Sequence, residues 1–262
     1  MISASPSFWL DSAILDWTPE FLSGTRQERE RVLRPHQILD HAYRLLADTP
    51  SPFELADALS NLKRAVNSRL QHVEEIYHLA STFPKSVGAL ERLEGVGLAK
   101  PFLIRALFDL RNDVEHNDAI PPSHQRCSEL ADTTWYFLKT TDYSCKTAVS
   151  GVTLHCESGL YARDPSLWLS VDLAATRGAE VSVNGWLPAS YLHDKPQPGA
   201  LPLVLVKQRS KSSRQYSDGS VVTTDGLTAH AKRGDDERYV VGSIGATDAL
   251  KRRLWALALQ SL

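Results

Sequence analysis

The amino-acid sequence predicts an α+β protein in which an N-terminal antiparallel helical bundle is followed by a β-rich domain that a helix closes. Apolar residues recur at spacings of three and four through much of residues 35–142. Short β-branched segments bounded by Gly, Pro, Asp or Ser follow from about residue 147. A length of 262 residues favours two modest domains. We place these domains at 1–145 and 146–262.

Two helices are predicted early in the first domain. Residues 35–47 place their apolar side chains on one face of a helix. A longer repeat of apolar residues extends from Leu55 to Tyr77. Ser51 and Glu54 precede it at the spacing of a capping box, in which each residue satisfies a free backbone N–H of the other. We therefore expect the longest helix to begin next to Ser51.

Two further helices complete the predicted bundle. A glycine-bearing stretch from Gly88 to Gly97 separates the long helix from a third one, which follows Pro101. Pro121 and Pro122 end that third helix, because proline lacks the N–H that an α-helix needs. A fourth helix follows, with an apolar stripe that includes Cys127, Leu130, Ala131, Phe137 and Leu138. Short connections between such helices favour an antiparallel arrangement.

Residues 1–34 have no clear period. They combine apolar anchors such as Phe8, Trp9 and Trp17 with the charged run RQERER. We expect a short helix here that packs on the bundle.

The second domain is predicted from five strand-like segments and a helix. The segments are TAVSGVTLHC, SLWLSVDLAA, AEVSVNGWL, LPLVLVKQ and RYVVGSI. Within the third segment, Asn184-Gly185 is a strong turn signal. The final ATDALKRRLWALALQSL returns to helical spacing, with Thr247 as its candidate N-cap.

Composition limits the classes of function. The chain carries a formal charge of −2, is 42% hydrophobic and has no apolar run near the roughly 18 residues of a membrane span. Its N-terminus lacks the basic region of a signal peptide. Cys127, Cys145 and Cys156 are too widely spaced for a zinc site or a disulfide framework, which indicates a reducing cytoplasm. The first 145 residues are net acidic and the remainder net basic, as for a protein with a polyanionic partner.

The stretch RNDVEHND at residues 111–118 is the densest polar cluster on the predicted helices. On a regular helix Arg111 and His116 are separated by about 140° once a full turn is subtracted, whereas Arg111 and Glu115 share a face. The cluster could therefore be an exposed Arg111–Glu115 ion pair with a solvated His116 near the helix C-terminus. Alternatively, the last turn before Pro121 unwinds and brings Arg111, Asn112 and His116 around one ligand.

The same stretch resembles the signature of HEPN domains, four-helix modules of bacterial defence and toxin systems that cleave nucleic acids or bind nucleotides. That signature is R-x(4–6)-H, often with a polar residue directly after the arginine. RNDVEH matches it, with Asn112 in the polar place. The flanking PFLIRALFDL and DTTWYFLKTTD and the earlier LKRAVNSRLQHVEEIY are also similar in kind. The resemblance covers residues from about 35 to 142.

The resemblance implies a metal-independent endoribonuclease, a toxin or antiphage effector without metal or other cofactor. In that function His116 is the general acid and base, since its ordinary pKa lies near neutrality. Arg111 stabilises charge on the phosphoryl oxygens, and Asn112 orients the phosphate or the imidazole. The product is a 2′,3′-cyclic phosphate end. HEPN domains pair, so the resemblance also implies a homodimer through the helical bundle, with an antitoxin or complex partner as a further candidate.

Two other classes of function stay open. The first is a non-catalytic module that binds a nucleotide or RNA, or that dimerises, in a defence or regulatory complex. The second is a structural subunit of a larger assembly. Cleavage of RNA that depends on His116 separates the enzyme from both.

Three other groups of residues are candidates for binding or chemistry. Residues 207–220 carry a basic segment that could contact an RNA backbone or be a solvated hairpin loop; its candidate RNA-binding residues are Lys207, Arg209, Lys211 and Arg214. Lys251-Arg252-Arg253 is expected to be a charged exterior face. Cys127, on an apolar stripe, is expected in the core rather than as a nucleophile.

Overall fold

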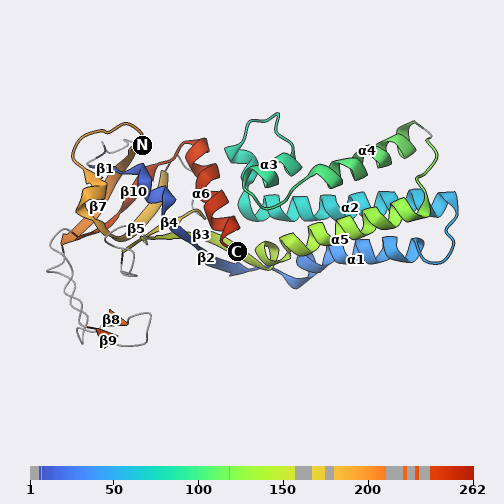
Figure 1. The fold of residues 1–262 in the computed structure, drawn as a ribbon, viewed down its shortest axis with the longest axis horizontal. Helices are drawn as coiled ribbons and strands as arrows, with labels where there is room; N and C mark the ends of the chain where they lie inside the picture. The colour runs from blue at the N-terminus through green and yellow to red at the C-terminus, as the bar shows by residue number, and fades with distance from the viewer. Residues whose placement is uncertain are drawn as a thin grey trace. The chain divides into compact units, whose positions relative to one another are not determined.

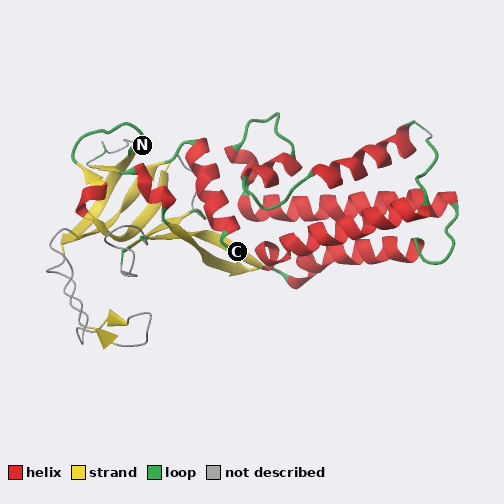
Figure 2. Ribbon diagram, viewed as in Figure 1, coloured by secondary structure: helices red, strands yellow, loops and turns green. Residues whose placement is uncertain are grey.

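The structure is a computed structural model that describes residues 6, 8–117, 119–156, 167–174, 180–210, 221–222, 228–229 and 237–262; for 208–210, 221–222 and 228–229 we describe the backbone alone. The chain forms two compact units, each built from two separate stretches of sequence. The sheet unit comprises Met1–Leu22 and Gly151–Leu254, and the helical unit comprises Ser23–Ser150 and Trp255–Leu262. Figures 1 and 2 show their helices and strands.

Five α-helices lie along the first stretch of the helical unit. They are α1 (Arg29–Leu45), α2 (Pro52–Tyr77), α3 (Ala89–Gly95), α4 (Phe102–His116) and α5 (His124–Lys146). Helix α2 packs against α1, α4 and α5, and α1 also packs against α5 (Figure 1). The four predicted helices are thus present, although α1 begins at Arg29 and includes Pro35 in its interior. Helix α3 lies in the stretch that we predicted only as a separator.

The start of α2 confirms the predicted capping box. The Ser51 N–H donates to Glu54 Oε2 at 2.7 Å, and the Glu54 N–H donates to Ser51 Oγ at 3.3 Å. Pro52 is the first helical residue, where its missing N–H costs nothing. The helix ends at His78, which has a left-handed φ of 50°. Residues at the start of α2 itself therefore determine where this longest helix begins.

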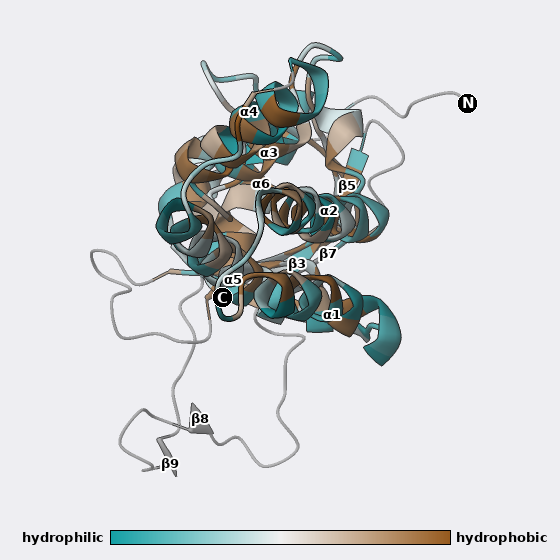
Figure 3. Cartoon of the chain, turned by 90° about the vertical axis from the view of Figure 1, so that its right-hand side faces the viewer, coloured by the Kyte–Doolittle hydropathy of each residue, from teal (hydrophilic) through white to brown (hydrophobic). Residues whose placement is uncertain are grey.

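The helical core is apolar, as the spacing predicted. Leu59, Leu62 and Val66 of α2 are fully buried, and so are Leu107 of α4 and Leu138 of α5. Figure 3 shows hydrophobic and hydrophilic residues alternating along α1, α2 and α4, as expected for helices with one buried and one solvated face.

One charged side chain is completely buried in this core. The side chain of Arg69 is 0% exposed, and its Nη2 lies 2.7 Å from Asp142 Oδ1. His36 Nε2 lies 2.8 Å from the same oxygen, and Arg69 Nη1 donates to the Thr141 carbonyl at 3.2 Å. We call Arg69, Asp142 and His36 the buried ionic network. It joins one residue each of α2, α5 and α1.

The buried ionic network lowers the pKa of Asp142. Burial by itself raises the pKa of the carboxyl group. The hydrogen bonds and charges of His36 and Arg69 outweigh burial and hold the Asp142 pKa below its usual range. Asp142 is therefore ionised in the folded protein at neutral pH.

One large sheet has most of its residues in the sheet unit; residues 23–26 and 147–150, at the ends of two of its strands, belong to the helical unit. Its strands are β1 (Phe8–Leu10), β2 (Thr18–Arg26), β3 (Thr147–His155), β4 (Trp168–Asp172), β5 (Glu180–Pro188), β6 (Leu192–His193), β7 (Leu201–Ser210) and β10 (Glu237–Gly245). They follow the order β2-β3-β4-β5-β10-β7-β1-β6. The pairs β3–β4, β4–β5, β5–β10, β10–β7, β7–β1 and β1–β6 are antiparallel. A separate two-stranded sheet joins β8 (Val221–Val222) and β9 (Thr228–Ala229).

The predicted fold class, a helical bundle followed by a β-rich domain, is wrong in its order. Residues 1–34 were expected to supply a short helix to the bundle, but Phe8–Leu10 and Thr18–Arg26 are strands. Strand β1 pairs with β6 and β7, more than half the chain away, and β2 lies at the edge of the same sheet. A run of three apolar residues has too few positions to distinguish a strand period from a helix period. The chain is a mixed helix-and-strand fold whose eight-stranded sheet draws on both ends of the sequence.

The five predicted strands of the second half are present, and so is the final helix α6 (Asp248–Gln260). The Thr247 hydroxyl accepts from the Leu250 N–H at 3.2 Å, which confirms the predicted N-cap. The predicted turn at Asn184-Gly185 is wrong. Both residues lie inside β5, where Gly185 pairs with Leu169 of β4 and Val240 of β10.

Close packing explains the glycine at this position. A Cβ on Gly185 would lie 2.0 Å from the Trp168 carbonyl oxygen and 2.8 Å from the Leu169 Cα. We expect Gly185→Ala to lower the free energy of unfolding of the sheet unit by about 1–3 kcal/mol, because backbone atoms must move to admit the methyl group. Urea unfolding followed by tryptophan fluorescence measures the change. Ser182→Ala, at an exposed position of the same strand, should change it by less than about 0.5 kcal/mol; equal effects of the two variants would contradict the packing argument.

Candidate functional site

The stretch RNDVEH forms the C-terminal part of α4. The helix continues to His116, and the Asn117 N–H still donates to the Asp113 carbonyl at 3.0 Å. The last turn is therefore not unwound, and Arg111 and His116 project about 140° apart. Arg111 follows the buried Ile104 and Leu107 at helical spacing and is partly buried, whereas His116 is exposed. Within one chain the structure does not bring these two side chains together.

Arg111 belongs to a cluster that joins α4 to α2. Its guanidinium forms an ion pair with Glu115, and its Nη1 donates to Asn112 Oδ1 at 3.4 Å. From α2, Lys63 Nζ donates to the same Asn112 oxygen at 2.8 Å, and the Ser60 hydroxyl donates to Glu115. We call these five residues, Ser60, Lys63, Arg111, Asn112 and Glu115, the α2–α4 cluster. It brings two cations, Lys63 and Arg111, and one carboxylate, Glu115, together where α2 meets α4.

The carboxylate of Glu115 is held in its charged form. The hydrogen bond from Ser60 is the largest cause of a Glu115 pKa below the usual range; partial burial opposes the shift, and the charges of Arg111 and His116 add to it. Near neutral pH this carboxylate is therefore charged and paired with the Arg111 guanidinium. The Arg111–Glu115 pair foreseen for a regular helix is thus present.

The cluster also leaves one polar atom without a partner. Arg111 Nε is buried and makes no hydrogen bond to any residue that the structure describes. The side chain as a whole is 23% exposed. A buried donor without an acceptor costs free energy. Arg111 therefore has hydrogen-bonding capacity that the described residues do not use.

The predicted RNA-binding segment lies largely outside the described residues. Lys207 is an exposed residue of β7, paired with Val241, and Arg209 is in the same strand opposite Tyr239. These two positions are in a strand and not in the predicted loop. Lys211 and Arg214 fall among the residues that the structure does not describe.

Of the predictions for Cys127 and for residues 251–253, the first is confirmed and the second is wrong in part. Cys127 is fully buried, as predicted, and burial raises the pKa of its thiol, so it is not an activated nucleophile. The prediction of a charged exterior face at residues 251–253 is wrong for Lys251, which is only 8% exposed. Arg253 is half-exposed and pairs with Asp16 at 2.6 Å.

Sequence reasoning missed a second polar region, between α1 and α2. A cavity there is lined by residues that include Arg31, Arg34, Arg64 and His72. A signal was present in the sequence, because Arg64, Ser68 and Gln71, and likewise Arg31 and Arg34, recur at helical spacing as polar stripes. The spacing alone does not show that the two stripes face the same cavity.

The described residues contain no group of three or more His, Cys, Asp or Glu side chains arranged to hold a metal ion. Nor does any helix in the described part of the chain have the length and apolar character needed to cross a membrane.

Comparison of the chain with protein-family models, with curated proteins and with solved structures finds no match in any of the three. The resemblance to HEPN domains therefore remains a prediction from RNDVEH and its flanking helices.

Proposed function

We propose that this chain is a metal-independent endoribonuclease that acts in the cytoplasm as a toxin or antiphage effector. Its catalytic residues are Arg111, Asn112 and His116. The observation that carries the proposal is the α2–α4 cluster, which holds Arg111, Asn112 and Lys63 in contact at the surface while His116 is exposed on the last turn of the same helix. Cations for a phosphate and an imidazole for proton transfer are the groups that such cleavage needs.

Each group has a defined task in this reaction. An imidazole takes the proton of the RNA 2′-hydroxyl as its oxygen attacks phosphorus, and a second imidazole gives a proton to the departing 5′-oxygen as the P–O5′ bond breaks. Arg111 binds the non-bridging oxygens as their charge increases. Asn112 orients the phosphate through its side-chain amide. The products are a 2′,3′-cyclic phosphate and a 5′-hydroxyl end.

The geometry of α4 leads us to infer that the active form is a homodimer through the helical bundle. Arg111 and His116 of one chain diverge by about 140° on a regular helix, so they do not converge on one phosphate. A two-fold dimer would supply both imidazoles and let Arg111 of one chain meet His116 of the other.

The test is cleavage of total RNA and tRNA by the purified full-length chain in EDTA, with analysis of the fragment ends. We expect cyclic phosphate ends from the wild type and, in the same incubation, no detectable cleavage from His116→Ala or Arg111→Ala. The matched controls are His41→Ala, at an exposed histidine of α1, and Arg126→Ala, which removes an exposed arginine that pairs with Glu129 on α5. Both should cleave like the wild type. Equal cleavage by all five proteins would refute the assignment, because the activity would then lie elsewhere.

Glu115 is expected to weaken the binding of RNA at Arg111. In Glu115→Gln the side-chain oxygen still accepts from Ser60, but the charge that neutralises Arg111 is gone. We expect a labelled single-stranded RNA to bind about two- to fivefold more tightly, the range for an exposed ion pair. Fluorescence anisotropy at one fixed salt concentration measures the affinity.

The control for this variant is Glu129→Gln, which removes one carboxylate paired with Arg126 elsewhere in the helical unit. It corrects for the general effect of one negative charge fewer. If Glu115→Gln and Glu129→Gln tighten RNA binding equally, Glu115 does not compete with RNA at Arg111.

A second candidate function is a module that binds RNA or a nucleotide without cutting it. The observation that favours it is the Arg111–Glu115 ion pair on a regular helix, which occupies the guanidinium. Such a module would bind RNA through Arg111 and Lys63 and would leave its ends unchanged. Binding that is lost in Arg111→Ala, without cleavage by the wild type, would select this function.

A further inference from the structure

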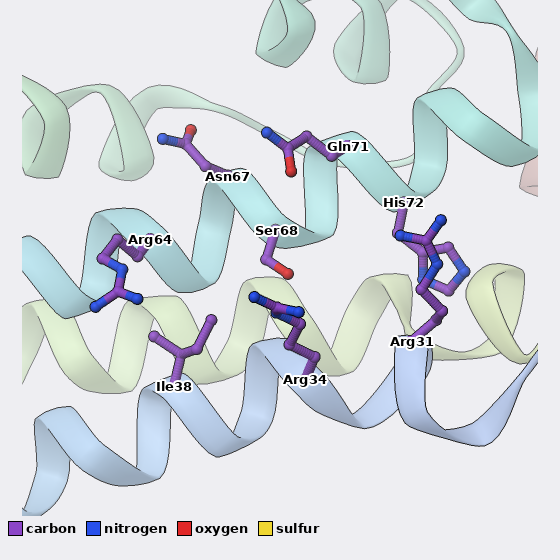
Figure 4. A pocket seen from close by; sticks show the side chains of 8 residues that line it. All are labelled: Arg31, Arg34, Ile38, Arg64, Asn67, Ser68, Gln71 and His72. Atoms are coloured by element: carbon purple, nitrogen blue, oxygen red, sulfur yellow. The ribbon is translucent and has the colours of Figure 1, made fainter.

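A cavity of about 440 Å³ lies between α1 and α2 in the helical unit. Its volume is within the range of ordinary small-molecule sites, about 300–1,000 Å³. Figure 4 shows Arg34 of α1 and Arg64 of α2 extending into the space between the two helices, with Ser68 facing Arg34. Two neighbouring helices thus contribute cationic and neutral polar groups to one cavity that is open to solvent.

The charges around this cavity are strongly unbalanced. Arg31, Arg34 and Arg64 line it, and none of its lining residues is acidic. Arg31 pairs with Glu75 at 2.7 Å, and Arg64 Nη1 donates to Asn61 Oδ1 at 3.1 Å. The side chain of Arg34 has no hydrogen-bond or ion-pair partner among the residues that the structure describes. Two of the three guanidinium groups therefore lack a carboxylate in the described part of the chain.

A second observation points to a ligand. His72 lines the same cavity and is only 5% exposed, yet its Nδ1 makes no hydrogen bond to the described residues. Burial, followed by the charge of Arg69, holds the pKa of His72 below its ordinary value. Its ring is therefore neutral at pH 7 and can donate through one nitrogen and accept through the other. Buried polar atoms of this kind normally have a partner.

The lining chemistry favours a phosphate group over an apolar ligand. Guanidinium groups present a planar fork of donors that matches phosphate oxygens. Asn67, Ser68 and Gln71 add neutral hydrogen-bonding groups, whereas Ile38 is the single aliphatic lining residue. A lipid chain or an aromatic base would find little apolar surface here.

We propose that this cavity is a binding site for a di- or triphosphate group, carried by a nucleotide or free as a short polyphosphate. Three guanidinium charges complement the several negative charges of such a group, and two helices provide contacts on both sides. The site does not depend on RNA cleavage, because it shares no residue with Arg111, Asn112 and His116. An experiment can therefore refute the phosphate-binding site without refuting the proposed nuclease activity, and the reverse.

The experiment is isothermal titration of the full-length chain with sodium tripolyphosphate. We expect one site per chain, with Arg34→Gln and Arg64→Gln each weakening the affinity about tenfold or more, as for the loss of a hydrogen bond to a charged group. Both residues are on the exposed surface of their helices, so folding should be retained, and far-ultraviolet circular dichroism checks this. Absence of saturable binding by the wild type would overturn the proposal.

Matched variants distinguish this site from general attraction by positive charge. Arg105→Gln and Arg126→Gln remove exposed arginines of α4 and α5 and should change the affinity less than twofold. Glu75→Gln releases Arg31 from its carboxylate and should tighten binding several-fold, an effect that misfolding does not produce. Equal weakening by Arg34→Gln and Arg126→Gln would overturn the proposal.

The source of the phosphate group is identified by comparing tripolyphosphate with ATP and GTP in the same titration. Tighter binding of one nucleotide assigns the site to that nucleotide, and equal affinities assign it to the phosphate group alone. Either result supports the site, provided that Arg34→Gln weakens it. An affinity for all three ligands that Arg34→Gln leaves unchanged would place binding elsewhere.

Discussion

Asp142→Asn is expected to lower the free energy of unfolding of the helical unit by about 3 kcal/mol, the lower end of the range for a broken buried ion pair. The substitution keeps the shape of the side chain but removes the charge that faces Arg69 and His36. The Arg69 side chain is 0% exposed, so water does not replace the lost carboxylate. The 11% exposure of Asp142 is why we take the lower end. Urea unfolding followed by circular dichroism measures the change.

The control for Asp142 is Asp132→Asn on the same helix. Asp132 is exposed and accepts a hydrogen bond from the Tyr43 hydroxyl at 3.0 Å. We expect its loss to cost less than about 1 kcal/mol, because surface polar contacts contribute little. The double variant Arg69→Met, Asp142→Leu should recover much of the stability lost by Asp142→Asn, since it leaves no uncompensated charge at these two positions. Equal losses from Asp142→Asn and Asp132→Asn would show that burial does not strengthen the network.

Acid should reduce the difference between wild type and Asp142→Asn. The folded-state pKa of Asp142 lies below its usual range, so its contribution is fully present above the unfolded-state pKa of about 3.9. That contribution is lost as the pH falls through the folded-state pKa. The stability difference should therefore be constant from pH 7 to about pH 5 and become smaller below about pH 4. A difference that grows with acid would have the wrong sign for this network.

His116→Ala is expected to reduce RNA cleavage by about 10²–10⁴-fold, the usual contribution of positioned acid–base catalysis. Arg111→Ala should have a comparable effect, because the extra charge on the phosphoryl oxygens loses its counter-charge. Arg111→Lys should restore only part of the rate, since an ammonium group lacks the planar fork of a guanidinium. Single-turnover rates on a defined RNA, with folding checked by circular dichroism, measure these effects.

Mixing the two inactive proteins tests the dimer directly. If the two motifs share one cleft, a dimer of one Arg111→Ala and one His116→Ala chain keeps one Arg111 and one His116 there, from different chains. Half of the randomly mixed dimers are of this kind and each lacks the second imidazole, so the mixture should cleave faster than either variant alone but below half of the wild-type rate. A mixture that cleaves no faster than the separate variants, after confirmed subunit exchange, would contradict a cleft shared between chains.

The parts of this fold that the sequence predicts are those determined by neighbours in sequence. Helix α2 follows from an apolar stripe and from the capping box of Ser51 and Glu54, all within its own length. The strand β5 follows from its β-branched residues, but Gly185 inside it does not. A glycine after an asparagine is a local turn signal, and only the approach of the Trp168 carbonyl reveals why the position is in a strand.

In the candidate site, too, only the contacts between residues close in sequence could be predicted. Arg111 and Glu115 share a helix face by spacing alone, and the structure shows the ion pair that this spacing allows. Lys63 and Ser60 join them from α2, which no spacing within α4 could indicate. The partner of Arg69 could not be predicted either. A charged residue beside an apolar stripe indicates a buried partner, but it does not identify Asp142 as that partner.

Strand β1 has a consequence for the synthesis of the chain. Leu10 pairs with Leu192 and Leu201, and translation at about 5–20 residues per second reaches these partners roughly 10–40 s after Leu10 is made. During that interval the nascent polypeptide carries Phe8-Trp9-Leu10 without the strands that enclose it. The growing chain thus exposes an aromatic segment to the ribosome surface and to chaperones until most of its length has been translated.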